Sequence, residues 1–190
     1  MIIALSGKLG SGKTYISEQI IKKTNFTKFA FGDILKEHAS KLANTDISNF
    51  YTQEGKNKII DNFHNVTHGE LLQLMGDPDN IKNTFLIDYM KDYNIHKLMW
   101  NDMNEVILKG IQNDNIIIDD LRFKHEANTL KSYKATIIRI TFDETKNKTR
   151  LNSNRNLNHI SETDLDDYNF DYYIKNDYND SCINEILKLI

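Results

Sequence analysis

An octapeptide near the start of the chain has the residue types and spacing of a phosphate-binding loop. Residues 7–14 match G-x-x-x-x-G-K-[ST] without a mismatch, between an apolar run and an amphipathic stretch. Glycines let the backbone curl so that several N–H groups point at one phosphate, and the following helix N-terminus adds positive charge. We expect Lys13 to reach the β- and γ-phosphates of ATP and the Thr14 hydroxyl to bind Mg²⁺. The predicted ATP-binding residues are Gly7, Leu9, Gly10, Ser11, Gly12, Lys13 and Thr14.

Acidic residues and one arginine follow apolar runs that are typical of buried strands. Asp33 follows the second run. Asp119 and Asp120 come directly after Ile116-Ile-Ile118, and Arg122 comes two residues later. Ligands collect at the carboxyl edge of open parallel sheets, where these residues would lie. A carboxylate there could accept a substrate proton or orient Mg²⁺-bound water, and an arginine could form paired hydrogen bonds with a phosphate. Two structural alternatives stay open: Asp33 as a helix N-cap, and Arg122 as an ion-pair partner of Asp119 or Glu126.

A polar segment, residues 144–158, is predicted to be a loop or mobile flap. The chain has 20 lysines but only 4 arginines, and two of these arginines, Arg150 and Arg155, lie in the flap. Phosphoryl transfer needs positive charge on the transferred group and exclusion of water, and a closing flap that carries arginines supplies both. Lys146 and Lys148 fit a solvated loop equally well. The predicted catalytic residues are therefore Lys13, Arg122, Arg150 and Arg155.

Length and composition favour one soluble globular domain. The chain has 190 residues, of which 39 % are hydrophobic and 27 % are charged, and a net charge of −3. No apolar run approaches the roughly 20 residues that span a bilayer, and the net charge gives no reason to expect nucleic-acid binding. The single cysteine, Cys182, cannot form an internal disulfide, in agreement with a reducing, cytoplasmic compartment. We therefore expect neither a membrane nor a nucleic acid as partner.

Apolar runs alternate with helical patterns along the chain. Strands are expected at residues 2–6, 28–31, 115–120, 135–141 and 170–174, and helices at 13–23, 33–42, 95–111, 123–131 and 179–190, with two or three more within 51–93. Short, uniformly apolar strands that alternate with helices predict a parallel sheet covered on both faces. We therefore predict a three-layer α/β fold in a single domain, residues 1–190, with a five-stranded parallel sheet. A small lid is expected at about residues 143–162.

Six segments together resemble the deoxynucleoside monophosphate kinases of large phages and DNA viruses. They are the phosphate loop, FGDILK at 31–36, GELLQLMG at 69–76, DDLRFKHEA at 119–127, HISE at 159–162 and FDYYIKN at 170–176. Their order and spacing agree with this family across nearly the whole chain, and the D-x-R-F-x-x-E-A stretch is the strongest single piece. The resemblance implies transfer of a phosphate from ATP, with Mg²⁺, to a deoxynucleoside monophosphate. It also implies a P-loop kinase fold with a small lid, and a host cytoplasm as the compartment if the chain is viral.

The resemblance also assigns residues to the acceptor site. It puts Asp33 and Lys36 near the substrate, with Gln73, Asp120 and Arg122 lining the same cleft. It makes Arg150 and Arg155 lid arginines, and through water Asp33 or Asp120 would support the Mg²⁺ held by Thr14. One departure concerns the basic residues that often flank the L-L-Q-x-x-G segment: here His68 precedes it and Lys82 follows it, so the preferred base stays open.

Two other functions remain open on the sequence. Phosphomevalonate kinase and dephospho-coenzyme A kinase share the phosphate loop and general layout, so the acceptor could be another small phosphorylated molecule. A P-loop ATPase or switch protein, which lacks a small acceptor, belongs to a different class. The predicted partners are small-molecule nucleotides, and the sequence leaves the oligomeric state, including a homodimer, open.

Overall fold

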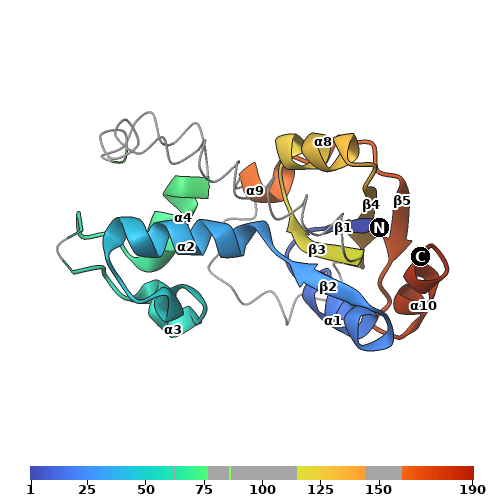
Figure 1. Cartoon of the computed structure of the whole chain (residues 1–190), viewed down its shortest axis with the longest axis horizontal. Coiled ribbons are helices and arrows are strands. Elements are labelled where there is room, and N and C mark those ends of the chain that lie inside the picture. Colours follow the sequence, from blue (N-terminus) through green and yellow to red (C-terminus); the bar gives the residue numbers. More distant parts are fainter. Residues whose placement is uncertain (62, 77–85, 87–114, 144–159) are drawn as a thin grey trace. The chain divides into compact units, whose positions relative to one another are not determined.

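The computed structural model describes residues 1–61, 63–76, 86, 115–143 and 160–190. The chain divides into two compact units. The first unit joins Met1–Ala30 to Leu108–Ile190, and the second is Phe31–Ile107 (Figure 1). Each unit is described by itself below. None of the helices in the described part of the chain is long and apolar enough to cross a membrane.

The first unit is built on a five-stranded parallel sheet. Its order is β2-β3-β1-β4-β5, and all four neighbouring pairs are parallel. The strands are β1 (Ile2–Ser6), β2 (Phe26–Phe29), β3 (Asn115–Leu121), β4 (Thr136–Thr141) and β5 (Tyr172–Lys175). The predicted fold class is therefore confirmed, with the second strand two residues earlier than expected and the third one residue longer.

Helices cover both faces of this sheet. Helices α1 (Lys13–Lys23) and α10 (Ser181–Leu187) lie on one face, and α8 (Lys124–Ser132) lies on the other (Figure 1). Because side chains alternate along a strand, one set of residues faces α1 and α10 and forms the main core. This core contains Ile3, Leu5, Ile16, Ile20, Phe26, Ile117, Ile138, Ile140, Ile174, Cys182, Ile183 and Ile186. The buried cysteine is free, as its isolation in the sequence requires.

The parallel strands bring the ends of β1, β3 and β4 to one edge of the sheet. At this edge β1 leads into the phosphate loop, and β3 carries Asp119 and Asp120 as its fifth and sixth residues. The strand thus runs through both acids instead of stopping before them, and it places the two side chains on opposite faces. The sheet therefore presents one carboxylate to α1 and the other to α8.

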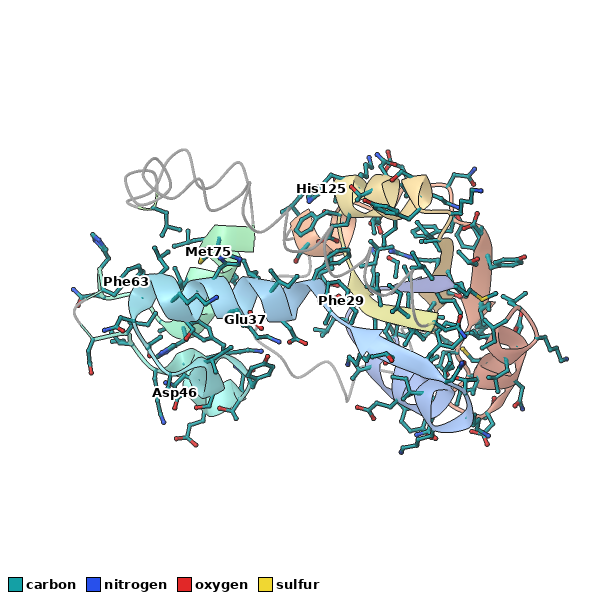
Figure 2. All side chains as sticks on the ribbon, in the orientation of Figure 1. Phe29, Glu37, Asp46, Phe63, Met75 and His125 are labelled. Atoms are coloured by element: carbon teal, nitrogen blue, oxygen red, sulfur yellow. The ribbon has the colours of Figure 1, made fainter. Side chains whose placement is uncertain are left out.

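The second unit is helical in its described part. It contains α2 (Phe31–Ala43), the 3₁₀ helix η1 (Ile47–Phe50), α3 (Gln53–Asn57) and α4 (His68–Gly76). Leu71 and Met75 are buried, as predicted for a core stripe, and Met75 lies on α4 beside α2 (Figure 2). His68 is buried and begins α4. The helix expected at 95–111 lies outside the described residues.

Candidate active site

The phosphate loop adopts the curled backbone that its glycines predict. Gly10 and Gly12 both have φ of +84°, in the left-handed region that side chains disfavour. A Cβ at Gly7 would lie 2.6 Å from the carbonyl oxygen of Ile140, and one at Gly12 would lie 2.6 Å from the side-chain nitrogen of Asn176. Both contacts are far too short for a side chain, so the loop packs closely against the ends of its neighbouring strands.

Helix α1 begins directly after the loop and suits an anionic ligand. Gly12 is its N-cap residue and has no side chain to cap the first amides, and no acidic side chain lies in the first turn. An N-terminus with uncapped amides and no acid attracts phosphate through its N–H groups and helix dipole. Thr14 is exposed in this first turn. The loop and α1 thus fit the phosphates of ATP, and the Thr14 hydroxyl fits a Mg²⁺ ligand bound with them.

Lys13 folds its ammonium group back over the loop. Its Nζ donates to the carbonyl oxygens of Gly7 and Lys8, the latter at 3.2 Å, and to Ser11 Oγ at 3.1 Å. The pKa of Lys13 is lowered to about 8, first by burial and then by the charges of Arg122 and Arg139, while Glu162 and Asp119 oppose the shift. Three cationic side chains therefore act on one loop. Glu162 and Asp166 pair with two of them, Arg122 and Arg139, and Lys13 adds a further positive charge that favours an anion there.

Asp119 is the strand-end acid that contacts α1. Its Oδ2 atom accepts a hydrogen bond from Ser17 Oγ at 3.0 Å and lies 2.7 Å from Lys28 Nζ. Ser17 is one turn after Thr14, so this buried carboxylate lies along the side of α1 that follows the loop. Asp120, which the sequence singled out, lies on the other face and faces the neighbourhood of Glu126. Asp119 is thus the better placed of the two acids to support a metal ion through water.

Arg122 is held at both its backbone and its side chain. Its backbone N–H donates to Glu126 Oε2 at 2.9 Å, and that carboxylate also accepts the N–H of Phe123 at 3.0 Å, which caps α8. Its Nη1 donates to Glu162 Oε1 and, at 3.3 Å, to the carbonyl oxygen of Ser161. Of the two ion-pair partners considered from the sequence, Glu126 binds the backbone of Arg122 and Asp119 pairs with Lys28. The guanidinium instead pairs with Glu162.

The acidic stretch that follows residue 160 clamps the loop edge of the sheet. Helix α9 (Ile160–Thr163) supplies Glu162, and the turn after it supplies Asp164 and Asp166. Asp164 Oδ2 accepts the N–H of Lys124 at 2.7 Å. Asp166 binds both Lys8 at 3.1 Å and Arg139 at 2.8 Å. These acids are therefore internal ion-pair and hydrogen-bond partners that hold α9 against the phosphate loop.

The segment after β5 braces the phosphate loop from a second direction. Asn176 is buried, and its side-chain nitrogen donates to the carbonyl oxygen of Ser11 at 2.9 Å. The hydroxyl of Tyr178 donates to the carbonyl oxygen of Gly10 at 3.1 Å. These two bonds engage carbonyl groups on the outside of the loop, so the loop N–H groups can point inward. The segment after β5 therefore supports the phosphate-binding conformation.

The remaining predicted acceptor residues belong to the second unit. Asp33 lies in the first turn of α2, so it is not the N-cap that the sequence left open. Its Oδ1 lies 2.7 Å from Lys36 Nζ, which sits over the ring of Tyr51 at 4.2 Å from the centroid. Burial and Asp33 raise the pKa of Tyr51. Gln73 is exposed on α4. That these residues share a cleft with Asp120 and Arg122 stays a prediction.

Most of the predicted lid lies outside the described residues. These include both lid arginines, Arg150 and Arg155, together with Lys146 and Lys148. The last part of the predicted lid, residues 160–162, forms α9, which begins one residue before Ser161. Within the described residues, no group of three histidine, cysteine or acidic side chains could hold a metal ion by itself.

The amino-acid sequence of the chain is similar to that of a viral protein. The chain is 27 % identical over 147 residues to a protein of Acanthamoeba polyphaga mimivirus described as "Putative deoxynucleotide monophosphate kinase". The match covers 74 % of this chain and 73 % of the viral protein. The chain is a distant homologue of that protein. No protein-family model matches the chain.

Solved structures agree on the fold. Dephospho-CoA kinase from Campylobacter jejuni aligns with 99 % of this chain and 96 % of its own, with a TM-score of 0.50 and 14 % identity. Shikimate kinase from Aquifex aeolicus covers 100 % of this chain and 95 % of its own, with a TM-score of 0.48 and 16 % identity. With the sheet order described above, the dephospho-CoA kinase match shows that the chain has the P-loop kinase fold.

Several residues at this edge were not singled out as site residues from the sequence. Glu162 was visible only as part of the HISE segment, and Asp166 only as part of an acidic run. Arg139 is one of four arginines and lies inside an apolar strand, which was a usable signal. Asn176 ends the FDYYIKN segment, but nothing in the spacing indicated that it binds Ser11.

Proposed function

We propose that this chain transfers the γ-phosphoryl group of ATP to a deoxynucleoside monophosphate and so forms the diphosphate. The observation that carries the proposal is the convergence of Lys13, Arg122 and Arg139 on a phosphate loop that has an uncapped helix N-terminus. Such a concentration of positive charge suits the phosphates of a donor and an acceptor together. The distant viral homologue, by its description, supports a nucleotide as the acceptor.

The chemistry needs little from the protein beyond position and charge. An oxygen of a monophosphate is already a nucleophile, so no strong general base is required. Lys13 binds the β- and γ-phosphates, Thr14 holds Mg²⁺, and Arg122 binds the acceptor's phosphate with a planar fork. When bound, Mg²⁺ neutralises charge on the transferred group. Arg150 and Arg155 complete this neutralisation when the lid closes.

Residues of the second unit are also proposed to bind the acceptor. The Asp33–Lys36 pair beside Tyr51 presents a carboxylate, an ammonium and an aromatic ring on one helical surface. These groups suit the sugar hydroxyls, phosphate and base of a nucleotide. Gln73 and Asp120 are each proposed to bind the acceptor, on the strength of the family resemblance.

A coupled assay tests the proposal. Purified protein with Mg·ATP is offered each common nucleoside and deoxynucleoside monophosphate, and separately phosphomevalonate and dephospho-coenzyme A. We expect diphosphate formation with at least one deoxynucleoside monophosphate. Turnover of a non-nucleotide acceptor alone would keep the kinase and refute the nucleotide acceptor. ATP hydrolysis that no acceptor stimulates would instead support a P-loop ATPase or switch protein.

A further inference from the structure

We propose that Glu162 is a positioning residue, whose carboxylate fixes the guanidinium of Arg122 at a set place beside the phosphate loop. The inference rests on the proposed function only in taking Arg122 to bind a phosphate group. Its basis is that one carboxylate spans two elements: Oε1 binds Arg122 Nη1, and Oε2 accepts the backbone N–H of Leu9 at 2.9 Å. Leu9 belongs to the loop itself, so Glu162 joins the arginine to the loop by a single side chain.

The setting of Glu162 makes this bridge stiff. The side chain of Glu162 is only 8 % exposed, whereas that of Arg122 is 29 % exposed. A shielded carboxylate depends on its partners to replace lost water, so it holds both of them firmly. Asp164, two residues later, is bonded to the backbone of Lys124 at the start of α8. The position of Glu162 is thus set by its own chain segment as well as by its two partners.

The anchor uses only part of the arginine. Both side-chain hydrogen bonds that Arg122 makes among the described residues start from Nη1, one to Glu162 and one to Ser161. A guanidinium has further N–H donors on Nε and Nη2. Glu126 also fixes the backbone N–H of Arg122, so the residue is held at both its backbone and its side chain. The remaining guanidinium N–H groups can then bind two oxygens of a phosphate.

A competing interpretation makes Glu162 an internal mimic of the phosphate that a ligand must displace. The contacts favour positioning, because Glu162 accepts from Leu9 in the first half of the loop and from no amide at the start of α1 within the described residues. The helix N-terminus, where phosphate is expected, is left to the ligand. The two interpretations predict opposite effects of removing the negative charge of Glu162. If Glu162 mimics phosphate, the ligand displaces it more easily and turnover rises. If Glu162 positions Arg122, the guanidinium is no longer held in place and turnover falls.

The central experiment compares Glu162→Gln, Arg122→Ala and the double variant. Glutamine keeps the shape and can still accept the N–H of Leu9, but it cannot form an ion pair with the guanidinium. We expect Glu162→Gln to lower kcat/KM for the monophosphate acceptor about tenfold or more, with little change in Tm. The double variant should be no slower than Arg122→Ala, because Glu162 acts through Arg122. Glu162→Asp, which keeps the charge, should recover part of the loss.

A matched control and a second readout separate this role from general structure and from the acceptor. Asp167→Asn removes a charge from the same segment, where Asp167 pairs with exposed Lys124, and should stay within about twofold of wild type. Nitrogen-15 NMR of the four arginine Nε–H groups, with Arg122 assigned by its loss in Arg122→Ala, needs no acceptor. The Arg122 signal should move toward that of a solvated arginine in Glu162→Gln and stay in place in Asp167→Asn.

Each outcome decides the inference. Unchanged or faster turnover in Glu162→Gln, losses that multiply in the double variant, or an Arg122 signal that does not move would overturn it. If the wild type phosphorylates no monophosphate, the proposed function fails, and the NMR comparison alone then decides whether Glu162 positions Arg122.

Discussion

The side-chain nitrogen of Asn176 donates to the carbonyl oxygen of Ser11 over 2.9 Å, which ties the segment after β5 to the phosphate loop. The same amide's oxygen accepts the N–H of Tyr178. Asn176→Ala should lower the free energy of unfolding by about 1–3 kcal/mol, because a buried carbonyl loses its donor. It should also weaken ATP binding. Urea unfolding and calorimetry measure the two effects, and Asn184→Ala, at an exposed position of α10, serves as the control.

Lys13 should give the enzyme an alkaline limit. Its pKa is lowered to about 8 by burial and by Arg122 and Arg139, against the opposing effects of Glu162 and Asp119. Only the protonated amine attracts phosphate, so kcat/KM for ATP should fall as the pH rises through about 8 in the free enzyme. A rate profile from pH 6 to 10 measures this limit.

Replacement of Lys13 gives the matching test of the loop. Lys13→Ala should remove phosphoryl transfer, at a loss on the order of 3 kcal/mol or more of transition-state stabilisation. The chain should stay folded, because burial opposes the charge that the substitution removes. Turnover and Tm are measured on the same preparation. Near-normal turnover would refute the assignment of the phosphate loop.

Arg122 should discriminate between the two ligands of the proposed reaction. A deoxynucleoside monophosphate at a hundredfold excess over its Kd should stabilise the wild type by about 2.7 kcal/mol. Arg122→Ala should remove most of this protection and leave protection by ATP largely intact. Arg122→Lys should not restore it, because an ammonium meets one phosphate oxygen where the planar fork meets two. Thermal shifts with each nucleotide give the comparison, and equal protection in all three proteins would contradict it.

Glu126 should make the stability of the fold depend on pH. Burial raises the pKa of Glu126 to about 8, although the N–H groups of Arg122 and Phe123 oppose the shift. Between the ordinary pKa of 4.5 and about 8, the folded chain therefore holds a proton on Glu126 that the unfolded chain has released. The stability that this proton contributes is fully present below pH 4.5 and is lost as the pH rises toward 8. Relative to Glu126→Gln, the wild type should lose at most about 1.4 kcal/mol of stability per pH unit across this window. Urea unfolding from pH 5 to 8 measures the slope, and parallel curves would refute it.

The arginines of the lid remain a sequence-based prediction. Arg150→Ala and Arg155→Ala should lower turnover more than they weaken ATP binding, because a closing lid acts on the transition state. Lys146→Ala and Lys148→Ala are the matched controls and should have little effect. Small, equal effects at all four positions would support a solvated loop.

Local pattern was sufficient to predict the sheet and the phosphate loop. Short apolar runs are typical of strands buried on both faces, and the helix expected at residues 13–23 has the bounds of α1. Helix α2 begins earlier than expected because Phe31 is buried, and the core decided this boundary rather than Asp33. Apolar burial thus set the elements reliably, and it moved their ends wherever one large side chain needed a place in the core.

The partners of the site could not be predicted in the same way. Glu162 and Leu9 are 153 positions apart, and Asn176 and Ser11 are 165 apart. Their contacts follow from the order of the strands and from the path of the chain after β4, and no residue spacing encodes either. The acidic run after residue 160 was visible in the sequence, but only its folded position shows that it neutralises Arg122, Arg139 and Lys8.

The central strand of the sheet meets its neighbours late in synthesis. β1 ends at Ser6, but it pairs with β3 and β4, and β3 begins only at Asn115. At the usual speed of a ribosome, roughly 5 to 20 seconds separate these segments. All of the second unit emerges in that interval, so it can fold while the apolar stretch Ile2–Leu5 still lacks a partner. The apolar residues of β1 therefore stay unpaired until β3 is made, and slowing translation would lengthen that exposure.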